Sequence, residues 1–143
     1  MSVRFPKTDA EIETFLAAFE AATLPKARWT HAAHLLCGAA YVHALGEVEA
    51  TDRMRLCVRR YNEAVGGQNT ATSGYHETVT VLWIKLLTRL RHEHPAASRP
   101  EFVALAVQTF ADSRTVLSTF YDFDVIASTD ARQRWVPPNL GSL

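Results

Sequence analysis

Histidine is the residue type through which this chain could do chemistry, because a neutral imidazole can ligate a metal ion or exchange a proton near pH 7. His31, His34 and His76 each lie three, four or seven residues before an apolar or small residue of the same predicted helix. Helical spacing therefore places these three side chains on the face that is turned toward the core. The chain contains six histidines in total, at positions 31, 34, 43, 76, 92 and 94.

Two predicted helices carry the three side chains. The first covers residues 31–45, with Thr30 as its N-cap and Gly46 just past its end. The second covers about residues 73–92, and a helix over residues 48–65 separates the two along the chain. Because short connections make neighbouring helices antiparallel, we expect the two histidine-bearing helices to run parallel. All three imidazoles should then lie at the same end of one core.

Three neutral imidazoles that converge from two helices form a facial metal site, with positions left open for water or substrate. The sequence therefore predicts His31, His34 and His76 as ligands of a divalent transition metal: Zn, Ni, Fe or Mn. Such a metal would lower the pKa of a bound water or polarise a substrate oxygen. Two interpretations without a metal stay open, a buried polar cluster and a ligand pocket.

Candidate residues for proton transfer lie beside this predicted site. Glu77 and Tyr75 flank His76 in the sequence, and we expect either of them to assist as a base or as a hydrogen-bond donor. Three further carboxylates are candidates for orienting an imidazole, although their spacing does not decide whether they reach it: Glu63, Asp122 and Asp124. The sequence has no Ser-His-Asp pattern, phosphate-binding loop or dinucleotide fingerprint.

The wider pattern predicts an all-α protein. Two capping-box sequences, Thr8–Glu11 and Ser98–Glu101, mark the starts of helices outside the histidine-bearing region. The sequence shows no internal repeat and no useful length of the alternation that is typical of strands. We therefore expect a single domain over residues 1–143, an antiparallel bundle of four to five main helices with an irregular C-terminal tail.

Composition argues against nucleic-acid and membrane partners and indicates the cellular compartment. The 15 basic and 15 acidic residues balance, so the chain lacks the net positive charge that would attract nucleic acids or membrane surfaces. Residues 1–6 contain no apolar core of a signal peptide, and no stretch approaches about 18 consecutive apolar residues. We expect a cytoplasmic protein with buried free thiols at Cys37 and Cys57 and a small-molecule ligand or substrate, and we leave a homodimer open.

Three segments carry a resemblance to a known group of proteins. They are Trp29–Leu35, which reads W-T-H-x-x-H-L, Thr72–Thr78, which contains G-Y-H-E-T, and Arg134–Leu140. Together they resemble the signature segments of an uncharacterised family of small bacterial helical proteins, across most of the chain. The predicted site is also loosely similar to the three-histidine metal centre of DinB-like bundles. There one histidine comes from the second helix and two from a later one, whereas here the order is two and then one.

These observations lead to two hypotheses of function. The first is a metal-dependent enzyme, a hydrolase, transferase or oxygenase, that acts on a small molecule at the three-histidine site. The alternative is a non-catalytic helical module that binds a small molecule or a protein partner. Metal content separates the first hypothesis from the second.

Overall fold

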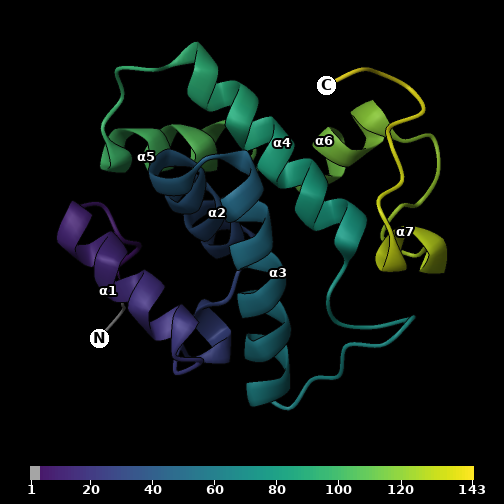
Figure 1. The fold of residues 1–143 in the computed structure, drawn as a ribbon, viewed down its shortest axis with the longest axis horizontal. Coiled ribbons are helices and arrows are strands. Elements are labelled where there is room, and N and C mark those ends of the chain that lie inside the picture. The colour runs from purple at the N-terminus through teal and green to yellow at the C-terminus, as the bar shows by residue number, and fades with distance from the viewer. Residues whose placement is uncertain (1–3) are drawn as a thin grey trace.

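The computed structural model describes residues 4–143, so the first three residues of the predicted domain, and of the segment searched for a signal peptide, lie outside it. Over this range the chain forms seven α-helices and one short 3-10 helix, η1, and no strand, which confirms the predicted all-α class (Figure 1). The elements, in order, are α1 (Asp9–Glu20), η1 (Lys26–Arg28), α2 (His31–Leu45), α3 (Glu47–Ala64), α4 (Glu77–Glu93), α5 (Arg99–Thr109), α6 (Ser113–Phe120) and α7 (Thr129–Gln133).

Helices α1, α2, α3 and α5 begin at or next to the predicted positions, α4 begins later, and α6 and α7 are shorter. The antiparallel bundle stays a prediction: in Figure 1, α3 runs down the middle of the view, whereas α4 runs obliquely from the lower right to the upper left. Among residues 4–143, no helix is both long enough and apolar enough to cross a membrane.

Local capping signals set the helix starts. At α1, the Thr8 hydroxyl accepts a hydrogen bond from the backbone N–H of Glu11, and the Glu11 carboxylate accepts one from the N–H of Thr8. Ser98 and Glu101 repeat this reciprocal pair at α5. Each pair satisfies two N–H groups that a helix end otherwise leaves without partners. Both predicted capping boxes are therefore confirmed by these hydrogen bonds.

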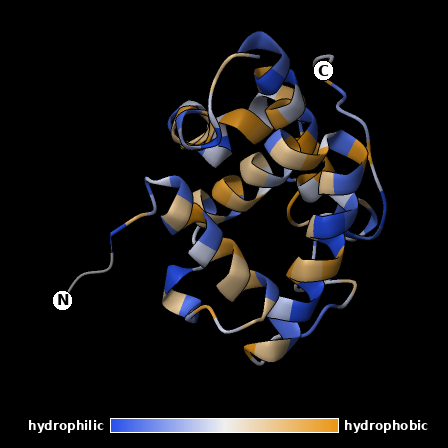
Figure 2. Ribbon diagram, turned by 60° about the vertical axis from the view of Figure 1, so that its left-hand side comes forward, coloured by the Kyte–Doolittle hydropathy of each residue, from blue (hydrophilic) through white to orange (hydrophobic). Residues whose placement is uncertain are grey.

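Helix α2 is the central element of the fold. It contacts α3, α4 and α5, and it is buried nearly all around its middle. Gly38 allows the close approach of α4, because a Cβ atom added there would lie 2.9 Å from Cδ1 of Leu87. Figure 2 shows the helices in the middle of the view mostly in apolar colours, whereas the outer turns carry most of the blue. The Cys37 and Cys57 thiols are free and buried, as predicted.

Helix α4 begins later than the sequence predicts. A loop over residues 65–76 connects α3 to it, with positive φ angles at Gly66 (89°) and Gly74 (78°) that favour glycine. Asn69 holds this loop, because its side-chain oxygen accepts from the backbone N–H of Tyr75 at 2.9 Å and its NH₂ donates to the Arg59 carbonyl at 3.0 Å. The start predicted near Ser73 is therefore wrong, and the helix begins at Glu77.

The C-terminal part packs on the outer side of α4. It brings a second, smaller apolar cluster, in which Leu82 and Leu86 of α4 contact residues of α6, α7 and the segment between them. Thr78 ties the tail to the start of α4: its hydroxyl donates to the Arg134 carbonyl at 2.6 Å and accepts from the N–H of Val136 at 2.9 Å. The tail is irregular, as predicted, and it is held by specific hydrogen bonds.

Candidate functional site

A cavity of about 590 Å³, partly open to solvent, lies among the helices. Its walls come from η1 and the start of α2, from the second half of α3, from the loop that follows α3 and from the first half of α4. This volume falls within the range of ordinary small-molecule pockets in proteins. The lining residues are Lys26, Trp29, Thr30, His31, His34, Gly38, Met54, Val58, Asn62, Val65, Gly67, Gln68, Ser73, Gly74, Tyr75, His76, Val79, Thr80, Trp83, Ile84 and Leu87.

All three predicted site histidines line this one cavity. His31 and His34 come from the first turn of α2, and His76 is the N-cap residue of α4. Helical spacing thus predicts their inward direction correctly, although His76 precedes its helix instead of lying in the first turn.

His76 uses both of its ring nitrogens within the protein. Nδ1 accepts a hydrogen bond from the backbone N–H of Val79 at 3.2 Å, and Nε2 donates to the Val125 carbonyl at 2.8 Å. The side chain is 9% exposed, and burial lowers the pKa of His76, so the ring is neutral at pH 7. The residue therefore caps α4 and attaches the segment between α6 and α7 to it.

His31 uses one ring nitrogen. Its Nε2 lies 2.8 Å from the carbonyl oxygen of Phe110, the residue that follows α5. A carbonyl oxygen only accepts hydrogen bonds, so Nε2 carries a proton, and in the neutral ring Nδ1 has the lone pair. Within residues 4–143, that Nδ1 has no hydrogen-bond partner. The ring lies beside Trp83, with the two ring centres 5.1 Å apart.

His34 has the opposite tautomer. Its Nδ1 lies 2.8 Å from the carbonyl oxygen of Thr30, one turn back along the chain, so Nδ1 carries the proton and the lone pair is on Nε2. Its ring centre is 3.9 Å from that of Trp29. Burial lowers the pKa of His34 to about 4, and the nearby His31 contributes in the same direction. The ring is therefore neutral at pH 7.

The histidines are not arranged as a metal centre. Over residues 4–143, no group of three or more His, Cys, Asp or Glu side chains is placed to hold a metal ion. The hydrogen bonds explain this, because His76 would have to give up the cap of α4 or the contact with Val125 before it could ligate. The structure therefore does not support the predicted set of His31, His34 and His76 as ligands of Zn, Ni, Fe or Mn.

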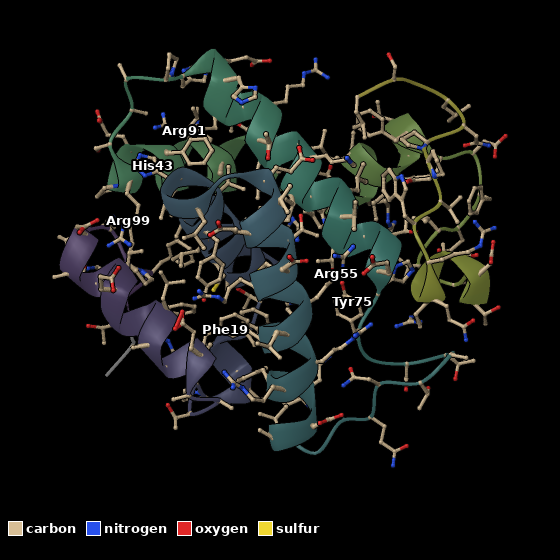
Figure 3. The ribbon with its side chains drawn as sticks, in the orientation of Figure 1. Phe19, His43, Arg55, Tyr75, Arg91 and Arg99 are labelled. Atoms are coloured by element: carbon tan, nitrogen blue, oxygen red, sulfur yellow. The ribbon has the colours of Figure 1, made fainter. Side chains whose placement is uncertain are left out.

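Glu77 and Tyr75, the predicted catalytic residues, belong to one ion-pair cluster with Arg55. Arg55 and Tyr75 are labelled in Figure 3. The Arg55 guanidinium donates to both carboxylate oxygens of Glu77, at 3.0 Å from Nε and 2.6 Å from Nη2, and the Tyr75 hydroxyl donates at 2.6 Å. Burial raises the pKa of Glu77, but the hydrogen bonds from Arg55 and Tyr75 outweigh it and hold that pKa below its usual value. The carboxylate is therefore a weak base, and it does not line the cavity.

Tyr75 does line the cavity. Burial raises the pKa of its phenol, and the hydrogen bond to Glu77 adds to the effect, so the hydroxyl stays protonated at pH 7. The Arg59 guanidinium lies over the tyrosine ring, 4.5 Å from its centre. These contacts fix the ring as part of the cavity wall.

The three remaining carboxylates serve local structure. Glu63 accepts from the side chain of Asn69 at 3.4 Å, and Asp122 accepts from that of Asn139 at 2.6 Å. Asp124 accepts from the backbone N–H of Ala127 at 3.2 Å. None of the three lines the cavity or bonds to one of its histidines.

Two residues of the cavity wall are missed by a sequence-based search for chemistry. Trp83 belongs to the apolar stripe of α4 in the sequence, yet it lines the cavity beside His31. Lys26 lies in η1 and is the single charged side chain among the lining residues of the described chain. The hydropathy pattern does not mark Trp83, because an apolar residue that faces a cavity has the same hydropathy as one that faces a packed core. The pattern carries no signal for Lys26 either.

Comparisons with known protein families, with curated proteins and with solved structures give no match to this chain. The resemblances carried by the W-T-H-x-x-H-L and G-Y-H-E-T segments therefore stay expectations.

Proposed function

We propose that this protein binds a small, uncharged and largely aromatic molecule in the cavity between α2, α3 and α4. The observation that carries this proposal is the cavity itself, because about 590 Å³ of space is lined mainly by apolar and aromatic side chains with a few polar groups among them. Such a combination is typical of ligand pockets.

The charge of the walls supports an uncharged ligand. Lys26 is exposed, and the imidazoles of His34 and His76 are neutral at pH 7 because burial lowers their pKa values. A cation or a dianion would lose its hydration without gaining an opposite charge in the interior, which costs several kcal/mol. A single negative group at the Lys26 side is the most charge that these walls accommodate.

The two tryptophans support an aromatic ligand. Trp29 is fixed by its stack on Phe19, with ring centres 4.6 Å apart and planes 17° apart. Trp83 is held between His31 and Phe110, with ring centres 5.1 and 5.9 Å away. Aromatic pairs contribute about 0.5–1.5 kcal/mol beyond the burial of their area, so a planar ligand gains from both walls.

A cytoplasmic location accords with this proposal. Cys37 and Cys57 are free thiols, and thiols stay reduced in the cytosol.

A neutral dye tests the proposal. N-phenyl-1-naphthylamine fluoresces more strongly in apolar surroundings, and we expect it to bind the wild-type protein in a saturable way. The blocking variant is Val58→Trp, since Val58 of α3 lines the cavity. The matched control is Val48→Trp on the same helix, because Val48 is 74% exposed and lies outside the cavity. Loss of binding in the first variant and retention in the second support the proposal, and equal binding by both overturns it.

Metal analysis of the same protein, purified without an affinity tag, separates this proposal from the metal-dependent enzyme. Dye binding that survives a chelator supports a metal-free pocket. A stoichiometric transition metal whose removal abolishes binding would overturn it and favour the enzyme hypothesis built on His31, His34 and His76.

A further inference from the structure

The next inference rests on the proposed function and specifies the class of its ligand. We propose that the ligand is a hydrogen-bond donor, an aromatic molecule with hydroxyl or amino groups, which donates to Nδ1 of His31 and Nε2 of His34.

The protein fixes the tautomers of both rings. The carbonyl oxygens of Phe110 and Thr30 each lie 2.8 Å from a ring nitrogen, and neither carbonyl can donate a proton. The nitrogen that faces each carbonyl must therefore carry the hydrogen. In the neutral ring the other nitrogen, Nδ1 in His31 and Nε2 in His34, is left as an acceptor.

Both acceptors belong to rings that line the cavity. Within the described residues, neither atom has a hydrogen-bond partner of its own. Water supplies the missing donors when the cavity holds no ligand. A ligand that displaces this water without replacing its hydrogen bonds loses affinity, whereas one with a donor at the same place keeps it.

These two acceptors discriminate more sharply than the other polar groups of the wall. Thr80 and Ser73 carry hydroxyls that rotate to suit a donor or an acceptor, and the amide of Gln68 presents both. His31 and His34 can become donors on the cavity side only by breaking their backbone hydrogen bonds or by taking up a proton. An ether or carbonyl oxygen placed against them is rejected, since two lone pairs then face each other.

The charge state of His34 supports the same conclusion. Burial lowers its pKa to about 4, so Nε2 remains an acceptor at neutral pH. The ring centre of Trp29 lies 3.9 Å from that of His34, so a flat ligand can stack on Trp29 while it donates a hydrogen bond to Nε2 of His34.

A pair of bicyclic compounds of the same shape tests the inference. The probes are 2,7-dihydroxynaphthalene, which has two donors, and 2,7-dimethoxynaphthalene, which has none. We expect calorimetry to show the diol binding at least about tenfold more tightly, since each neutral hydrogen bond contributes roughly fivefold to tenfold. The hydrophobic effect alone predicts the reverse order, because the ether is the more apolar compound.

Two variants of His34 assign the preference to this residue. His34→Leu should lower the preference for the diol roughly fivefold to tenfold, and His34→Gln should lower it as well, because a side-chain amide presents a donor as well as an acceptor and so accommodates the ether. His92→Leu, at an exposed histidine outside the cavity, is the control and should leave the preference unchanged. The readout is the ratio of the two dissociation constants, which a loss of packing changes little because it weakens both compounds alike.

Nitrogen NMR of the wild-type imidazoles gives a second measurement that needs no variant. The resonances of His31 Nδ1 and His34 Nε2 should move on addition of the diol and stay nearly constant with the ether. Equal affinity for both compounds, with unchanged ring resonances, would overturn the donor inference and leave the proposed function standing. If neither compound binds up to its solubility limit, the proposed function and this inference both fail.

Discussion

The Nε2 atom of His76 lies 2.8 Å from the carbonyl oxygen of Val125, a residue 49 positions further along the chain. The same ring accepts from the backbone N–H of Val79 and so caps α4. One side chain thus completes the start of α4 and attaches the segment between α6 and α7 to it. The motif that contains His76 accordingly has a clear structural role, whatever further role the cavity has.

Replacement of His76 separates these two contributions. His76→Ala loses the cap, worth about 0.5–2 kcal/mol, and the bond to Val125, worth about 0.5–1.5 kcal/mol, so we expect a loss of roughly 2–3 kcal/mol in the free energy of unfolding. His76→Asn keeps a good cap and should recover about half of that loss. Urea denaturation followed by circular dichroism measures both variants. A loss below about 0.5 kcal/mol in the alanine variant would contradict the structural role.

Acid should destabilise the fold through His34. Its pKa falls from 6.5 to about 4 on folding, so the unfolded chain binds more protons between these two pH values. Stability is therefore present above pH 6.5 and is lost as the pH falls toward 4, by about 3 kcal/mol from this residue. His34→Gln should flatten the profile in that window. Denaturation midpoints measured across the window test this, and identical slopes for wild type and variant would contradict it.

Glu77 should matter for stability and not for ligand binding. Its carboxylate is bound by Arg55 and Tyr75 and lies outside the cavity lining. Arg55 is 38% exposed at its side chain, so solvent weakens the pair, and Glu77→Gln should cost only about 1 kcal/mol. The affinity for N-phenyl-1-naphthylamine should not change. A tenfold loss of affinity in a folded variant would instead give Glu77 a direct part in binding.

Two glycines of the loop between α3 and α4 form a matched pair. Both have positive φ angles, but a Cβ atom at Gly66 would meet nothing within 4 Å, whereas one at Gly74 would lie 2.4 Å from the backbone oxygen of Gln68. Gly66→Ala should cost about 1–2 kcal/mol for the backbone conformation alone. Gly74→Ala should cost more and should weaken dye binding, because Gly74 lines the cavity. Equal losses of unfolding free energy in the two variants would show that the loop does not have this backbone conformation.

Much of the fold can be predicted from the sequence because its signals are local. The capping boxes at Thr8 and Ser98 and the N-cap at Thr30 depend on residues within one turn, and all three are present. The inward direction of His31 and His34 follows from helical spacing for the same reason. The start of α4 is predicted wrongly, because Gly74 turns the chain and His76 caps the helix, where periodicity alone extends the helix to Ser73.

The chemistry of the site could not be predicted from local signals. The partners of His31 and His76 are the carbonyls of Phe110 and Val125, which lie 79 and 49 residues away. Backbone carbonyls are common to all residues, so the sequence does not mark which two will meet an imidazole. These hydrogen bonds decide which nitrogen is an acceptor, and they occupy the third histidine of the predicted metal set. The cavity is also invisible in the sequence, because the hydropathy of Trp83 is equally typical of a core residue.

The most direct test of the cavity as a ligand site uses the chain's three tryptophans. Trp29 and Trp83 line the cavity, whereas Trp135 lies outside it, near Lys85. A ¹H–¹⁵N spectrum gives one indole signal for each, and N-phenyl-1-naphthylamine is added stepwise. The account predicts saturable shifts of the Trp29 and Trp83 signals while that of Trp135 stays in place. Shifts of Trp135 alone, or no shift of any indole signal, would contradict it.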